Sequence, residues 1–124
     1  MTWIDLCNEW EMKEYYKNEK AFQADYIKAM REDGWWVYKL PDVSYTLKPF
    51  DMICIKDGVS VAIELKYGRV NTYERIYKML RPNQVWGLQH FKEHWGTSKI
   101  IGWDKKDNKV YEYDFILNNY TWVL

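Results

Sequence analysis

The fold is decided by residues 50–66, which read FDMICIKDGVSVAIELK. Two apolar runs rich in β-branched side chains flank Asp57-Gly58, and this pattern predicts a two-residue β-hairpin, because that turn requires positive φ at both central residues. The turn also fixes the register, so that the numbers of facing residues sum to 115, as 57 and 58 do. We therefore expect Asp51 to face Glu64 across the hairpin.

Away from its turn, this hairpin is apolar except for three charged residues at its open end, Asp51, Glu64 and Lys66. Strand alternation places Glu64 and Lys66 on one face, and facing carboxylates, with Cβ atoms roughly 4.5–5.5 Å apart, repel each other. A divalent cation between them would relieve the repulsion, and oxygen ligands favour Mg²⁺, with Mn²⁺ as a substitute, over zinc. The alternative is a solvent-facing strand on which Asp51 pairs with Lys66.

Polar side chains also interrupt the apolar faces of two helices predicted to cover the sheet. A helix over residues 19–33, ended by Gly34, carries Glu19 and Gln23 on the face that bears its apolar stripe. A later helix begins at Pro82, ends at Gly96, and places one polar residue among apolar ones on a single face: Gln84, Leu88, Phe91 and Trp95. Polar groups on buried faces need partners, so we expect these three polar side chains to converge on the charged end of the hairpin.

The remaining segments complete a small α/β domain with a mixed sheet flanked by helices. Helical spacing of apolar residues predicts a further helix over residues 3–17, and aromatic content predicts a strand over 35–38. Residues 67–81 form a polar connector with a short helix capped by Asn71, and two more strands follow over 99–103 and 110–115. We expect a single domain over residues 1–124.

Composition narrows the class of protein. Eighteen basic residues balance eighteen acidic ones among 124, while 23 aromatic residues make 19% of the chain. These values argue against a disordered chain and against a cationic nucleic-acid coat protein. The sequence contains no membrane-spanning run and does not start like a signal peptide, and Cys7 and Cys54 fit no zinc or disulfide pattern. We expect a cytoplasmic protein, bacterial, archaeal or phage-encoded, or one that is otherwise intracellular.

Charge is nevertheless unevenly distributed along the chain. Residues 66–81 hold five basic residues and one acidic residue with interleaved tyrosines, whereas residues 1–34 hold eight acidic and five basic residues. Cations for phosphates and rings for unpaired bases are typical of nucleic-acid contacts, here Arg69, Tyr73, Arg75, Lys78 and Arg81. A solvated surface helix explains the same segment equally well.

The histidines, four of the tryptophans, Cys54 and the last five residues are interpreted as structural. His90 and His94 have an i, i+4 spacing that can bind metal, but the sequence offers no evident third ligand. The tryptophans at positions 3, 10, 35 and 36 are expected in the core or a dimer interface, and Cys54 in the core. The apolar residues 120–124 could pack on the core or on a second subunit.

The chain resembles the PD-(D/E)xK nucleases in its core motif, which here consists of Asp51 and, after twelve intervening residues, Glu64-Leu65-Lys66. Residues 19–23 (EKAFQ), with Gly34 eleven residues after the glutamine, are similar to the opening helix of VRR-NUC-type nucleases and of archaeal-type Holliday-junction resolvases. The resemblance implies a restriction-endonuclease-like core (α-β-β-β-α-β) over about residues 19–103, with an extra N-terminal helix. One residue separates Pro49 from Asp51, which departs from the strict Pro-Asp pair.

The resemblance also implies a function. It implies a Mg²⁺-dependent endonuclease that hydrolyses DNA phosphodiester bonds, with catalytic residues Asp51, Glu64, Lys66 and Gln84. Its implied metal ligands are Glu19, Asp51, Glu64 and the backbone carbonyl of Leu65, and Gln23 would support them from outside. The implied substrate is branched DNA such as a Holliday junction, in recombination and repair, and the implied form is a homodimer. The alternatives are a non-catalytic nucleic-acid-binding or assembly protein on this fold, and a nuclease acting on RNA or a cyclic oligonucleotide.

Overall fold

The computed structural model describes residues 16–42 and 48–118. Nearly all of the helix predicted over 3–17, and the apolar residues 120–124, lie outside these ranges. The described elements, in chain order, are α2 (Glu19–Glu32), β1 (Trp36–Lys39), β2 (Met52–Lys56), β3 (Val59–Gly68), α3 (Tyr73–Tyr77), α4 (Pro82–His94), β4 (Thr97–Asp104) and β5 (Lys109–Asp114). No helix in this part of the chain is long and apolar enough to cross a membrane.

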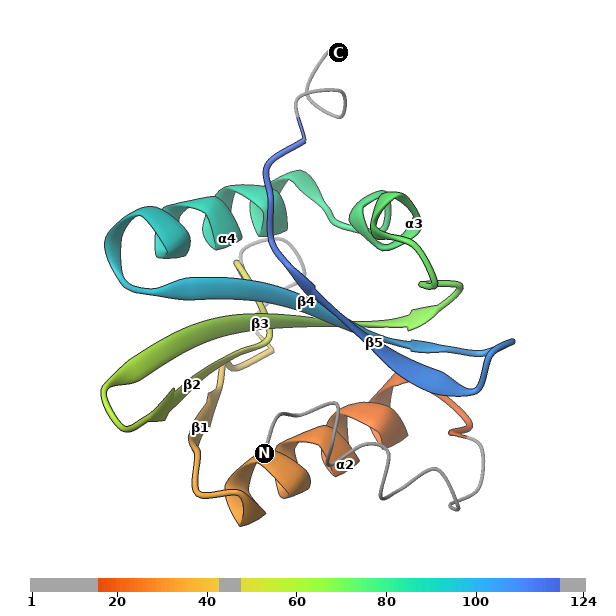
Figure 1. Cartoon of the computed structure of the whole chain (residues 1–124), viewed down its shortest axis with the longest axis horizontal. Coiled ribbons are helices and arrows are strands. Elements are labelled where there is room, and N and C mark those ends of the chain that lie inside the picture. Colours follow the sequence, from red (N-terminus) through yellow and green to blue (C-terminus); the bar gives the residue numbers. More distant parts are fainter. Residues whose placement is uncertain (1–15, 43–47, 119–124) are drawn as a thin grey trace.

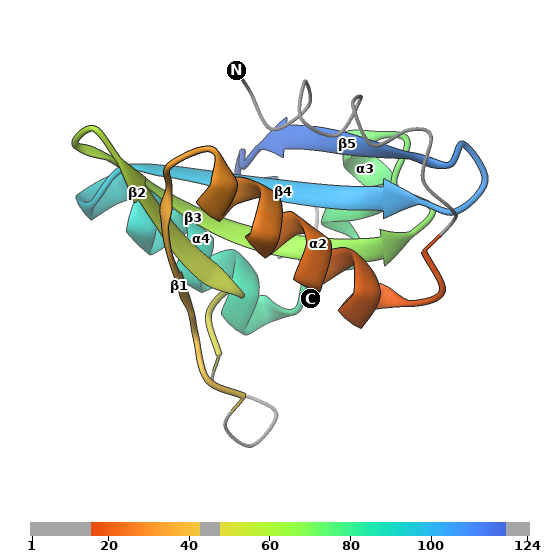
Figure 2. The same ribbon diagram turned by 90° about the horizontal axis from the view of Figure 1, so that it is seen from below.

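The five strands form one mixed sheet in the order β1-β2-β3-β4-β5. Strands β3 and β4 are parallel, and the other neighbours are antiparallel. The connection from β3 to β4 contains α3 and α4, which cover one face of the sheet, while α2 covers the other (Figure 1). Viewed from below, α2 lies across β3 and β4 (Figure 2). The predicted mixed sheet between helices is confirmed.

The predicted hairpin has the expected turn and register. Asp57 and Gly58 have φ values of 50° and 79°, and Lys56 pairs with Val59 at the base of the turn. The ladder continues through Ile53 opposite Ala62, but β2 begins only at Met52, so Asp51 lies just before the strand instead of within it.

Each face of the sheet has its own apolar core. On the α2 face, Phe22 and Tyr26 pack against alternate residues of β3 such as Ile63 and Leu65. On the other face, Leu88 and Phe91 of α4 pack with Ala62 and Ile100. The strand period of two therefore directs the odd-numbered positions of β3 toward α2 and the even-numbered ones, including Glu64 and Lys66, toward α4. Cys54 is fully buried, as predicted.

The helix termini confirm some predictions and correct others. Gly34 follows α2 with φ 94°, as expected for a helix-ending glycine. The short helix α3 is capped by Thr72, whose Oγ1 accepts from the Arg75 N–H (3.2 Å), so the predicted Asn71 cap is wrong. The prediction that Trp95 shares the buried face of α4 is also wrong: it is 75% exposed, because the helix ends at His94.

One close contact fixes α4 relative to the start of the hairpin. A Cβ placed on Gly87 would lie 2.3 Å from the Cβ of Pro49, so only glycine permits this approach. The Asn83 side chain reinforces the contact by donating to the carbonyl oxygen of Lys48 (2.8 Å). The first turns of α4 are thereby held against the segment that leads into Asp51.

Candidate active site

Asp51 is held by the strand that it was predicted to face. Its backbone N–H donates to the carbonyl of Ile63 (3.0 Å), and its Oδ2 accepts from the backbone N–H of Leu65 (2.7 Å). Its Oδ1 forms an ion pair with Lys48 (3.2 Å). The Asp51 carboxylate is therefore fixed beside residues 63–65 from one side and beside a lysine from the other, and the alternative pairing with Lys66 is not observed.

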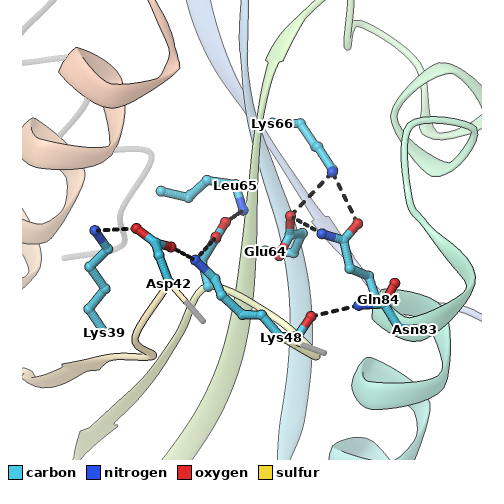
Figure 3. A network of polar contacts seen from close by, with 9 residues as sticks. Lys39, Asp42, Lys48, Glu64, Leu65, Lys66, Asn83 and Gln84 are labelled. Atoms are coloured by element: carbon cyan, nitrogen blue, oxygen red, sulfur yellow. Dashed lines mark hydrogen bonds and ion pairs between the residues drawn. The ribbon is translucent and has the colours of Figure 1, made fainter. Parts of the chain in front are cut away.

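Glu64, Lys66 and Gln84 form a closed triangle of polar contacts (Figure 3). The Lys66 Nζ lies 3.2 Å from Glu64 Oε2 and donates to Gln84 Oε1 (3.1 Å). The Gln84 Nε2 donates to the same Glu64 oxygen (3.0 Å). Gln84 reaches these groups because it is in the first turn of α4, where its Oε1 also accepts from the backbone N–H of Arg81 (2.9 Å).

The other oxygen of Glu64 has no such partner. Glu64 is 2% exposed, and its Oε1 is a buried atom without a hydrogen bond to any described residue. Burial, with the nearby negative charge of Asp51, raises the pKa of Glu64 to about 8, although Lys66 opposes this effect. A buried acid with one unsatisfied oxygen next to a second carboxylate is an arrangement that a bound cation would stabilise.

Lys48 was not predicted as a site residue. It bridges Asp51 and Asp42, the latter at 2.8 Å, and these two carboxylates raise the pKa of Lys48 although its partial burial acts in the opposite direction. Figure 3 shows how this lysine extends the polar network from β3 to the loop after β1. Its position three residues before Asp51 was the available signal, but spacing alone could not show that its side chain turns back toward Asp51.

The two polar residues of α2 differ in their relation to this cluster. Glu19 is surface-exposed on the opposite side of the sheet from α4, yet partial desolvation and the charge of Asp51 raise its pKa, with Lys66 opposing. Glu19 is thus within electrostatic range of the cluster. The buried Nε2 of Gln23 makes no hydrogen bond to the described residues, so the network does not include Gln23. Of the three predicted helical side chains, Gln84 alone makes direct contact.

The predicted metal ligands are near one another but do not form a closed set. Among the described residues, Glu19, Asp51 and Glu64 do not have ligand atoms that all lie within 4.8 Å of one another. The donor set of carboxylate oxygens and a backbone carbonyl is nevertheless the kind that Mg²⁺ prefers, and Mg²⁺ usually retains several waters. The residues present therefore fit a Mg²⁺ ion held through few protein oxygens, with the unsatisfied Oε1 of Glu64 as one of them.

The basic segment divides into anchored and exposed side chains. Arg69 pairs with the buried Asp104 (3.2 Å), and the Tyr73 hydroxyl donates to the carbonyl of Ile116 while its ring packs edge-on against Tyr113. Arg75 is exposed, and so is Lys78, which pairs with Glu74 one helical turn away (3.0 Å). Arg81 is exposed at the start of α4, next to Gln84.

Comparison with known proteins identifies the family. The family model described as archaeal Holliday junction resolvase (Hjc) matches residues 15–121, which is most of the chain. The chain belongs to this family. The resemblance to PD-(D/E)xK resolvases seen in the sequence is thereby confirmed, and the protein is a member of a family of Holliday junction resolvases, which are nucleases acting on branched DNA.

Solved structures agree on the fold of this resolvase family member. Hjc from Archaeoglobus fulgidus, described as a Holliday junction resolvase from an archaeal hyperthermophile, superposes with a TM-score of 0.55 at 14% sequence identity. The match covers 75% of this chain and 72% of that one. No curated protein sequence matches the chain. The chain therefore shares the fold of that protein at low sequence identity.

Proposed function

We propose that this resolvase family member is a Mg²⁺-dependent endonuclease that hydrolyses phosphodiester bonds in branched DNA. The observation that carries the proposal is the buried Glu64, which has one unsatisfied oxygen and lies beside Asp51 and Lys66. Asp51, Glu64 and the Leu65 carbonyl would hold the ion, with Glu19 as a further ligand or acceptor of its waters. Bound Mg²⁺ supplies a Lewis acid for the phosphoryl oxygen and acidifies a coordinated water.

The side chains around the ion would have distinct tasks. Lys48 and the Leu65 N–H hold both oxygens of Asp51 and so fix its direction. Lys66 positions the attacking water or stabilises the negative charge that develops on the phosphate. Gln84 binds both Lys66 and Glu64, so it orients the lysine relative to the carboxylate.

Substrate binding is proposed to involve the basic segment. Arg75, Lys78 and Arg81 are exposed and could contact phosphates, whereas Arg69 and Tyr73 also have structural partners. The protein is proposed to act as a single-domain homodimer. Light scattering of the purified protein, alone and with a four-way junction, would measure the number of copies.

Cleavage of a synthetic four-way junction and of a linear duplex of matched sequence, in Mg²⁺ and in EDTA, tests the proposal. Wild-type protein should cut the junction in Mg²⁺ but not in EDTA. Glu64→Gln and Lys66→Ala should each reduce the cleavage rate in Mg²⁺ by about a thousandfold or more. The ion pair between Lys99 of β4 and Glu112 of β5 (3.1 Å) supplies matched controls. Variants with Glu112→Gln or Lys99→Ala should cleave the junction at the wild-type rate.

Equal cleavage by wild-type protein and Glu64→Gln would overturn the assigned site. Tight junction binding without cleavage in either Mg²⁺ or Mn²⁺ would instead indicate a binding protein on a nuclease fold. Preferential cleavage of an RNA junction would redirect the substrate assignment.

A further inference from the structure

The C-terminal half of α4 carries a second group of metal-ligating side chains, far from the acidic cluster. His90, Glu93 and His94 have ligand atoms that all lie within 4.8 Å of one another. Their i, i+3 and i+4 spacing places them on one face of the helix. Within residues 16–42 and 48–118 this is the one set of three or more His, Cys, Asp or Glu residues that meets this distance limit, and Glu93 supplies the third ligand that sequence spacing had not revealed.

The geometry of the group suits a small tetrahedral ion. Metal–ligand bonds to imidazole nitrogen and carboxylate oxygen of about 2.0–2.2 Å place adjacent tetrahedral ligand atoms roughly 3.3–3.6 Å apart. The three ligand atoms already lie within 4.8 Å of one another on a single helix, so the remaining change is one of side-chain torsions. Two imidazoles with one carboxylate select Zn²⁺, Ni²⁺ or Cu²⁺, whereas Mg²⁺ prefers oxygen ligands alone.

The position on the helix favours a positive charge. All three residues are in or near the last turn of α4, where the unpaired carbonyls create a partial negative charge. The one lysine within this turn, Lys92, directs its Nζ to the carbonyl oxygen of Phe115 (2.9 Å). Among the described residues, no hydrogen bond or ion pair engages the Glu93 carboxylate, so its oxygens are available to an ion.

Neighbouring aromatic rings restrict one of the ligands before an ion binds. The His90 ring contacts the Trp86 ring with centroids 4.0 Å apart, and the centroids of the His90 and His94 rings are 5.7 Å apart. Both histidines line an apolar groove of about 520 Å³ between α4 and the hairpin, together with Trp86 and Trp95. A partly immobilised imidazole loses less conformational freedom on binding a metal.

We propose that His90, Glu93 and His94 form a surface site for a borderline divalent transition-metal ion such as Zn²⁺. The site is separate from the proposed Mg²⁺ site, because its ligands are six to ten positions beyond Gln84, which is roughly 9–15 Å along the helix axis. Three protein ligands leave at least one coordination position for water. The inference does not depend on the proposed nuclease activity.

Calorimetric titration of the full chain with ZnCl₂, with Mg²⁺ in excess to occupy oxygen-ligand sites, tests the proposal. One ion should bind per chain, and His90→Ala and His94→Ala should each weaken binding by at least about tenfold, since loss of even an outer-shell partner typically costs about 10–100-fold. Glu93→Gln should have a smaller effect in the same direction. The chain has only two histidines, so nuclear magnetic resonance of the imidazole nitrogens should show both responding to Zn²⁺.

Two control variants separate this site from other ligands. Cys7→Ser and Glu64→Gln should bind Zn²⁺ as the wild type does, and Cys54 is buried with a pKa of about 12, which keeps its thiol protonated. The proposal is overturned if Zn²⁺ binding survives in His94→Ala but disappears in either control. It is equally overturned if the wild type binds no Zn²⁺ below millimolar concentration. Neither outcome bears on junction cleavage, which Glu64→Gln tests by itself.

Discussion

Glu64 on β3 and Asp104 at the end of β4 are both buried carboxylates on neighbouring parallel strands, but their surroundings differ in one respect. Asp104 Oδ1 accepts from the Val70 N–H (2.7 Å) and Arg69, and its Oδ2 accepts from the Asp107 N–H (2.7 Å). Burial opposes ionisation of Asp104, but these donors outweigh it and lower its pKa. Glu64, in contrast, retains one oxygen without a partner and has a raised pKa.

This difference separates a structural carboxylate from one that is available to a ligand. The donors around Asp104 come from the chain itself, so the ionised acid stabilises the loop after β3 and the turn after β4. The environment of Glu64 supplies donors to one oxygen only, so the folded protein disfavours the ionised form until a cation compensates. Buried acids that the fold leaves unsatisfied are therefore better candidates for metal ligands than acids that are simply close together.

The largest effect on stability is expected from Asp104→Ala. Removing this carboxylate leaves the Val70 N–H buried without an acceptor and Arg69 without its partner, so the free energy of unfolding should fall by about 3–5 kcal/mol. Urea denaturation measures the change. Glu64→Gln, measured in the same way at pH 5 without metal, should alter stability by less than about 1 kcal/mol. Equal destabilisation by the two substitutions would remove the distinction between these acids.

A smaller change in the free energy of unfolding is expected when the pH is varied, and the contributions of Glu64 and Asp104 should have opposite signs. Glu64 has a pKa of about 8 when folded against 4.5 as its ordinary value, so the folded state binds more protons between these values and stability without metal should fall as pH rises from 5 to 7.5. The expected loss is about 2–3 kcal/mol, and Glu19 adds to it in the same direction. Asp104 contributes stability that is lost only as pH falls below about 3.8.

Thermal unfolding across this pH range, in EDTA and in Mg²⁺, measures the effect. Glu64→Gln should flatten the pH dependence between 5 and 7.5. Saturating Mg²⁺ should offset the loss of stability in the wild type and should have little effect on the stability of the variant. A wild-type profile that rises with pH over this interval without metal would contradict the assigned state of Glu64.

An intermediate effect on activity, without much change in stability, is expected from Gln84→Ala. The substitution removes an acceptor for Lys66 and a donor to Glu64, so the cleavage rate should fall by about tenfold to a hundredfold. Gln23→Ala, a matched glutamine on α2 outside the network, should change the rate by less than about threefold. A larger effect at Gln23 than at Gln84 would show that the α2 face contributes more to the site than the direct contacts indicate.

The smallest effects are expected from two arginines of the basic segment, Arg69, which pairs with Asp104, and Arg75, which is exposed. Arg69→Ala should lower the free energy of unfolding by about 1 kcal/mol with little change in junction affinity, since its guanidinium is held by Asp104. Arg75→Ala should leave the free energy of unfolding nearly unchanged. It should weaken junction binding by about 0.5–1 kcal/mol, and this loss should shrink at high salt. Fluorescence anisotropy of a labelled junction at two salt concentrations separates the two outcomes.

Features that depend on local chemistry were predicted well from the sequence. The Asp57-Gly58 turn, the register of β2 and β3 and the end of α2 at Gly34 were all predicted, because turn geometry and strand alternation involve residues close in the chain. The placement of Asp51 was less accurate. Its carboxylate turns toward the Leu65 N–H just before β2 begins, which a rule for paired strand residues does not describe.

Features that depend on packing between distant segments were not predictable in the same way. Lys48, Gln23 and Glu93 illustrate this: the first joins the site, the second stays outside the hydrogen-bond network, and the third completes a group with two histidines. Each outcome depends on the direction in which a side chain leaves its backbone relative to elements far away in the chain. Helical periodicity specifies a face but not what that face contacts.

The sequence by itself determined the hairpin, its register, the helix boundaries around Gly34 and Pro82, and the placement of Glu64 and Lys66 on one strand face, because short-range sterics and periodicity control these features. Only the tertiary structure decided which residues surround that face. Close packing of Gly87 against Pro49 brings Gln84 and Lys48 to opposite sides of the acidic pair. Whether a buried carboxylate is satisfied depends on those long-range neighbours, and this is what distinguishes Glu64 from Asp104.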